Sequence, residues 1–273
     1  MALSALMIYW FARLKAKGFW PESGDLLELG PQDITTTESV VRSAFSGFVD
    51  SPRLDQAMPD IFKNGRPRGN SQRILYGLLG NKSYKSADLF DKRADFSIDL
   101  NGDNRSFGEF DIVTNFGTSE HIFNIGTSFK ISDRLTKENG LLLFVLPAFG
   151  HINHGFYNIH PTLYFDFSRE NNYKIEDIIY VDNFGARCRN IERTPAELPD
   201  FDNFPINLHR DRSDALERLV TERYVANVLD AGTRAYVAEF PAICFDYCFV
   251  ALRKQRASDV PLRPPTQGIY AAG

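Results

Sequence analysis

The sequence predicts a single α/β domain in which a mostly parallel central sheet has helices on both faces. Short apolar runs alternate with helical patterns along the 273 residues, with no internal repeat. The run GLLLFVLPAFG, residues 140–150, is apolar over nearly its whole length, which is typical of a strand buried on both faces. These two observations together favour a parallel sheet with crossover helices.

The amino-acid composition indicates a globular protein that does not bind nucleic acid or span a membrane. Hydrophobic residues make up 43% of the chain and charged residues 24%, which suits a globular protein with a sizeable core. The net charge of −4 gives no bulk attraction for nucleic acid, so we expect a small-molecule substrate and leave the oligomeric state open. The apolar run 1–12 is shorter than the roughly 20 residues that cross a bilayer. We therefore predict a packed helix there, with no signal peptide and no membrane partner.

The cysteines indicate neither a disulfide framework nor a zinc site. Cys188, Cys244 and Cys248 are an odd number without zinc-binding spacing. A cytoplasmic location is the corresponding expectation.

The expected elements follow in order along the chain. A strand at 25–30 leads to a helix that begins with the capping-box spacing of Thr35 and Glu38. The polar, Pro- and Gly-rich stretch 50–72 is predicted to be an inserted loop. Up to residue 150 we then expect a helix ending at Gly80, a strand ending near Asp88, a short element at 96–103, a strand at 110–117, a helix at 121–135 and the strand at 140–150. After it we expect a helix at 161–173, a strand at 175–184, a second insertion at approximately 191–212, a helix stopped by Gly232, a last strand at 245–254 and a tail at 255–273.

Polar residues stand where several of these strands end. Ligands of open α/β sheets bind outside the carboxyl ends of the strands, near the point where the strand order reverses. Gly30 would let a ligand approach the backbone after the first strand. Asp88 could accept hydrogen bonds from both hydroxyls of a ribose, and the Asp99–Leu100 pair could contact an adenine edge. The G-x-G-x-x-G pattern is missing after the first strand, which disfavours nicotinamide and flavin cofactors.

Four motifs in this order resemble those of a known family. LLELGPQD, YKSADLF, FSIDLNGD and GEFDIVTNFGTSEH are similar to the successive nucleoside-binding motifs of class I S-adenosylmethionine-dependent methyltransferases. The resemblance covers roughly residues 20–150. It departs from the family at Pro31-Gln32, where a second glycine is usual, and in the long spacing from Glu28 to Asp88, which we attribute to the 50–72 insertion.

The resemblance implies a Rossmann-like class I methyltransferase fold with S-adenosylmethionine as cofactor. It implies that Glu28 and Gly30 border the methionine end, and that Asp88 holds the ribose. It further implies adenine contacts from Asp99 and Leu100 and a contact between the methionine amino group and the backbone around Asn115.

The segment HINHGFYNIHP, residues 151–161, follows the strongest predicted strand and holds three histidines. A metal site of His151, His154 and His160 is one interpretation, although the ligand types around it do not favour one. A second is a polar helix start whose histidines bond to the backbone. We favour a third, a substrate-facing wall, and expect no metal. The residues expected to take part are, as catalytic groups, His154, His121 and Tyr157, and, as substrate-binding groups, His151, Asn158 and His160.

The predicted function is therefore methyl transfer from S-adenosylmethionine to oxygen or nitrogen of a small polar acceptor, such as a sugar-like compound or secondary metabolite. A metal-dependent enzyme and a non-catalytic nucleoside-binding module remain the alternatives. The tail, predicted to be disordered from its Pro and Gly content, could still close over the pocket through Ile269 and Tyr270.

Overall fold

The central sheet has the strand order β10-β11-β9-β8-β2-β6-β7. The computed structural model describes residues 2–102, 105, 107–148, 154–181, 247–257 and 259–267. Two small ribbons, β1 with β3 and β4 with β5, lie outside this sheet. The strands are β1 (Ala2–Leu3), β2 (Asp25–Leu29), β3 (Asp33–Ile34), β4 (Phe62–Lys63), β5 (Arg66–Pro67), β6 (Ser83–Asp88), β7 (Phe96–Ser97), β8 (Phe110–Phe116), β9 (Thr136–Pro147), β10 (Tyr173–Val181) and β11 (Tyr247–Lys254).

Strands β7, β6, β2, β8 and β9 run parallel to one another, and β11 runs antiparallel to both β9 and β10. In chain order the five parallel strands follow the doubly wound pattern, with the reversal of direction between β2 and β8. The predicted α/β fold, with a mostly parallel central sheet and helices on both faces, is confirmed. The switch point between β2 and β8 marks where a ligand is expected.

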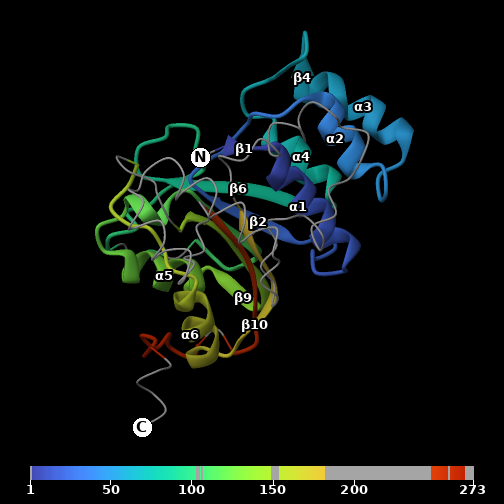
Figure 1. Cartoon of the computed structure of the whole chain (residues 1–273). Coiled ribbons are helices and arrows are strands. Elements are labelled where there is room, and N and C mark those ends of the chain that lie inside the picture. The colour runs from blue at the N-terminus through green and yellow to red at the C-terminus, as the bar shows by residue number, and fades with distance from the viewer. Residues whose placement is uncertain are drawn as a thin grey trace, which may run out of the picture.

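Helices cover the two faces of the sheet in separate groups (Figure 1). One hydrophobic cluster contains residues of α1 to α4, and the other contains residues of α5 and α6. The helices are α1 (Ala5–Ala16), α2 (Glu38–Phe45), α3 (Ser51–Ile61), α4 (Gln72–Leu78), α5 (Ile125–Arg134) and α6 (Thr162–Glu170), with a 3₁₀ turn at Ser119–His121.

The alternation of side chains along each strand explains the two clusters. Leu26 packs with α1 to α4, whereas its neighbour Leu27 packs with α5 and α6. In β9, Leu141 and Leu143 face the first cluster, and Leu142 faces the second. Because successive side chains of a strand point to opposite faces, an apolar run without alternation requires helices on both sides.

The N-terminal apolar run forms the packed helix α1, as predicted. Its Trp10 Nε1 and Arg13 Nε each donate a hydrogen bond of 3.0 Å to Asp177 Oδ2. Asp177 lies on β10, so this buried ion pair ties the start of the chain to the far edge of the sheet. Within the described part of the chain, no helix combines the length and apolarity needed to cross a membrane.

The prediction of a loop at 50–72 was wrong. The segment contains α3 and the β4–β5 ribbon. Asp50 caps α3 by accepting a hydrogen bond from Arg53 N, and proline is tolerated in the first turn of a helix. Leu54, Met58 and Ile61, spaced as one helical face, are buried. The helical spacing of these three apolar residues was overlooked because of the surrounding Pro and Gly, and their burial against the rest of the protein stabilises the helix.

Three smaller expectations differ in their outcome. The capping box of Thr35 and Glu38 does not form, because Thr37 occupies the N-cap of α2. The prediction of a disordered tail was wrong for its described part, which packs on α6: Asn171 Oδ1 accepts from Arg263 N at 2.7 Å, and Arg169 Nη2 donates to Thr266 O. Several predictions fall on residues that the structure does not describe: the insertion at 191–212, the helix before Gly232, Cys188, Cys244, and the tail residues Ile269 and Tyr270.

Candidate active site

A cavity of about 380 Å³ opens where the carboxyl ends of the parallel strands meet. It is lined by residues 30–32, 87–91, 98–101, 117, 118, 121 and 122, which follow or end β2, β6, β7 and β8. The predicted site residues among them are Gly30, Asp88, Asp99, Leu100 and His121. The position of the cavity at the switch point agrees with the rule for open α/β sheets.

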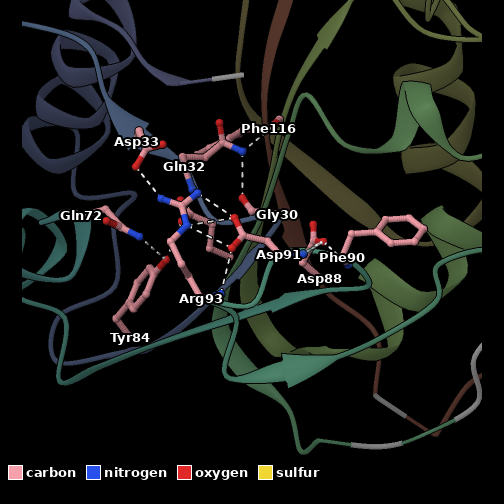
Figure 2. Close-up of polar contacts among 11 residues, drawn as sticks. Gly30, Gln32, Asp33, Gln72, Tyr84, Asp88, Phe90, Asp91, Arg93 and Phe116 are labelled. Carbon is pink, nitrogen blue, oxygen red and sulfur yellow. Dashed lines mark hydrogen bonds and ion pairs between the residues drawn. The ribbon is translucent and has the colours of Figure 1, made fainter. Parts of the chain in front are cut away.

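The loop after β2 needs glycine at position 30. Gly30 has a φ of 80°, and a Cβ placed there would lie 2.6 Å from Thr118 Oγ1. That hydroxyl donates to Leu29 O at 2.8 Å, so it cannot move away without losing a bond. Gln32 Nε2 fixes the loop further by donating to Gly30 O at 2.8 Å and Phe116 O at 3.0 Å (Figure 2). These contacts together hold the backbone of the Gly30–Gln32 loop, which forms one wall of the cavity.

Replacing Gly30 with alanine is expected to destabilise the protein by about 1–3 kcal/mol. The left-handed backbone costs an L-residue about 1–2 kcal/mol, and the contact with Thr118 adds to this. Urea unfolding of Gly30→Ala measures the cost. The double variant Gly30→Ala/Thr118→Ala should recover the part due to the contact, and a cost that is strictly additive in the double variant would contradict the steric explanation.

Glu28 lies beneath this loop and has no exposed surface. Its carboxylate accepts hydrogen bonds from Tyr84 OH at 2.6 Å, Tyr76 OH at 2.8 Å and Gln32 N at 2.9 Å. Burial raises the pKa of Glu28 to about 7, although the three hydrogen bonds act in the opposite direction. Glu28 does not line the cavity; it holds the loop that does.

Asp88, at the end of β6, is held by its own turn. Its Oδ1 accepts from Phe90 N at 2.7 Å and from Asp91 N at 2.8 Å, and Oδ2 makes no hydrogen bond within the described ranges (Figure 2). Arg93 braces the same turn, since it contacts both oxygens of Asp91 and donates to Asp33 Oδ1 at 2.6 Å. One carboxylate oxygen thus orients the side chain, and the other is left for a ligand.

The residues predicted to contact an adenine and those predicted to contact a methionine end differ in how they lie. Asp99 Oδ1 accepts from Asn101 N at 2.9 Å in a tight turn, and Leu100 is nearly buried in the cavity wall. Asn115 is fully buried and does not line the cavity. Its amide donates to Ser119 Oγ at 2.7 Å and Ser132 Oγ at 3.2 Å, which fixes the turn that presents Gly117 and Thr118.

Three polar side chains cluster beside the cavity. Glu120 Oε1 lies 3.3 Å from His154 Nε2 and 3.8 Å from His121 Nε2, and we name these residues the two-histidine cluster. The Glu120 side chain is 0% exposed, and its buried Oε2 has no hydrogen-bond partner among the described residues. Burial raises the pKa of Glu120, whereas burial and the nearby His154 lower the pKa of His121. Sequence reasoning missed Glu120, although it directly precedes His121.

Hydrogen bonds join the two segments that carry the histidines. Glu120 O accepts from Phe156 N at 2.8 Å and Tyr157 N at 3.3 Å, and Tyr157 OH donates to Phe123 O at 2.8 Å. A Cβ at Gly155 would lie 2.8 Å from Glu120 O, so only glycine fits this approach. The contact brings residues 154–157 against the end of β8, which places His154 beside His121.

The other residues of the histidine segment lie apart from this cluster. His160 Nδ1 accepts from Thr162 N at 3.2 Å, which is the helix-start role that the second interpretation gave to such histidines. Asn158 is exposed, and His151 is outside the described residues. The exposed rings of Phe123 and Phe156 meet edge to face at 6.2 Å and add an apolar rim next to the histidines.

Comparisons with known proteins give similarities to solved structures alone. No protein-family model and no curated protein matches the sequence. An O-methyltransferase from a trans-AT PKS multienzyme of Brevibacillus brevis, in complex with S-adenosyl-L-homocysteine, is 15% identical over 95% of this chain and 74% of its own, with a TM-score of 0.37.

Two further structures show the same level of similarity. Phosphoethanolamine N-methyltransferase 2 of Haemonchus contortus, in complex with S-adenosyl-L-methionine, is 14% identical over 93% of this chain and 58% of its own, with a TM-score of 0.43. The cyclase SpnF is 15% identical over 90% and 80%, with a TM-score of 0.40.

Proposed function

We propose that the protein is an S-adenosylmethionine-dependent methyltransferase that acts on a hydroxyl or amine of a small molecule. One observation carries the proposal. A single cavity at the switch point of the sheet is bounded by the Asp88 carboxylate, by the Asp99–Leu100 turn and by the Gly30 and Gly117–Thr118 backbone, and it reaches His121. This is the succession of groups that a nucleoside with an amino-acid end requires.

Each part of the cofactor has a partner in this proposal. The unbonded Oδ2 of Asp88 accepts from the ribose hydroxyls, and the Asp99–Leu100 turn contacts the adenine. The methionine end lies along Gly30 and Gly117, where the backbone is exposed to the cavity. Glu28 and Asn115 act indirectly in this assignment, because each holds one of those backbone segments from below.

The acceptor enters from the side of the two-histidine cluster. Methyl transfer needs the acceptor atom in line with the methyl group and water excluded, and the sulfonium leaves as a neutral thioether. His121 and His154 can take the proton that an acceptor hydroxyl loses. Tyr157 keeps their two segments together through its bond to Phe123 O. The exposed Phe123 and Phe156 rings would contact an apolar part of the acceptor.

Calorimetric titration with S-adenosylmethionine and S-adenosylhomocysteine tests the proposal. We expect saturable binding of both, followed by transfer of a labelled methyl group to members of a panel of hydroxylated and amine acceptors. If neither cofactor form binds, the proposal fails. If both bind and no acceptor in a broad panel is methylated, the cavity is a nucleoside-binding site without this activity.

A further inference from the structure

We propose that Glu120, His121 and His154 bind one divalent first-row transition-metal cation, such as Zn²⁺ or Fe²⁺. Two imidazole nitrogens and one carboxylate oxygen are ligands that these ions share, and they leave open coordination positions for a small molecule. This site differs from the His151, His154 and His160 grouping considered from the sequence, since it contains a carboxylate from the end of another strand.

The donor atoms already lie near the required separations. Around a cation with bonds of about 2.0–2.2 Å, neighbouring donors stand roughly 3–3.5 Å apart. The carboxylate oxygen of Glu120 is 3.3 Å from Nε2 of His154 and 3.8 Å from Nε2 of His121, and all three donor atoms lie within 4.8 Å of one another. The side chains of His154 and His121 are 32% and 44% exposed, so small rotations of the two rings can shorten the distance between their donor nitrogens.

A second observation concerns the carboxyl group of Glu120. It is fully buried, its Oε1 lies near both histidines, and within the part of the chain that the structure describes its Oε2 has no hydrogen-bond partner. A buried carboxylate without a neutralising partner is costly, and a cation bound at Oε1 would compensate its negative charge. The backbone of Glu120 is fixed by the N–H groups of Phe156 and Tyr157, so the ligand is held in place before any ion arrives.

The site faces the cavity, because His121 is part of the cavity wall. This step rests on the proposed methyltransferase function: the open positions of the cation would hold the acceptor oxygen beside the methyl group. The cation would then lower the pKa of that hydroxyl in place of a histidine base, since proton and cation compete for the same Nε2 atoms.

Metal binding by the whole chain tests the site directly. Protein freed of metal by chelation and dialysis is titrated with Zn²⁺ by calorimetry and with Co²⁺ by visible absorption. We expect one saturable site in the wild type. In Glu120→Gln and in His154→Ala the affinity should fall by more than about 100-fold, beyond the loss seen when only a supporting residue is removed. His160→Ala is the matched control and should bind as the wild type does.

Absence of saturable binding in the wild type would overturn the proposal, as would unchanged affinity in both Glu120→Gln and His154→Ala. Loss of binding in His160→Ala alone would overturn it in favour of a different histidine set. Thermal unfolding shows whether each variant is folded, and His154→Ala decides should the buried Glu120→Gln not fold. S-adenosylmethionine binding, measured on the same samples, separates the two proposals: cofactor binding without metal rejects only the cation site, and metal binding without cofactor rejects only the methyltransferase.

Discussion

Replacing Asp88 with alanine will weaken the binding of S-adenosylmethionine by about 100-fold or more while the protein stays folded. Hydrogen bonds from ribose hydroxyls to a carboxylate contribute roughly 1.5–3 kcal/mol each, and about 1.4 kcal/mol corresponds to a tenfold change in affinity. Two such bonds would be lost. Calorimetric titration of the wild type and of Asp88→Ala gives the difference directly.

The turn that Asp88 makes with its own backbone calls for two further variants. Asp88→Asn keeps an oxygen for Phe90 N and Asp91 N but removes the charge, so the gap between the Asn and Ala variants reports the contribution of the turn. Asp95→Ala is the control outside the cavity, because its carboxylate bonds to Lys85 and Ser86. Wild-type affinity in Asp88→Ala, or an equal loss in Asp95→Ala, would refute the ribose assignment.

The second large effect is a pH dependence of stability caused by Glu28. Its folded pKa is raised from 4.5 to about 7, so the folded state prefers the neutral carboxyl. The associated stability is fully present below pH 4.5, decreases as the pH rises toward about 7, and changes no further above it. At about 1.4 kcal/mol per pKa unit, the decrease is about 3 kcal/mol for this one residue.

Glu28→Gln isolates that contribution. The free energy of unfolding of the wild type, minus that of the variant, should fall by about 3 kcal/mol between pH 4.5 and pH 8 in urea titrations, since glutamine does not titrate. Tyr84→Phe offers a check on the cause. It removes a hydrogen bond that lowers the folded pKa of Glu28, so the decrease should extend to higher pH and become larger. A difference between wild type and Glu28→Gln that is constant with pH would show that the carboxyl does not titrate in this range.

The parts of the fold that the sequence predicts well are those with local signals. The apolar run from residue 140 to 147 lies in β9 and is buried on both faces, Asp88 ends its strand, and Asp99 follows β7 by two residues. Helix α3 was missed because Pro52 and Pro59 suggest a loop when each is considered alone. The burial of Met58 and its two neighbours on that face, which stabilises the helix, depends on α4 and the rest of the first cluster.

The sequence indicates which residues lie at or near the candidate site better than it indicates what each of them does there. The motif around Glu28 predicts a cavity-lining acid, but Tyr76 and Tyr84 come from α4 and β6 and enclose it. The two-histidine cluster depends on a contact between residues 120–123 and 154–157 that no local pattern encodes. In both cases the position of the side chain depends on contacts between residues far apart in the chain, and a single sequence does not show which distant residues meet.

The antiparallel strand β11 has a consequence for how the chain acquires its structure. Val181, which ends β10, is paired with Tyr247, which begins β11, and β11 stands between β10 and β9. During synthesis β9 therefore keeps one side unpaired until residues 247–254 leave the ribosome, with a row of open backbone groups over an apolar stretch. Pairings this distant in sequence form slowly. We therefore expect the nascent chain to be prone to aggregation until β11 has been made.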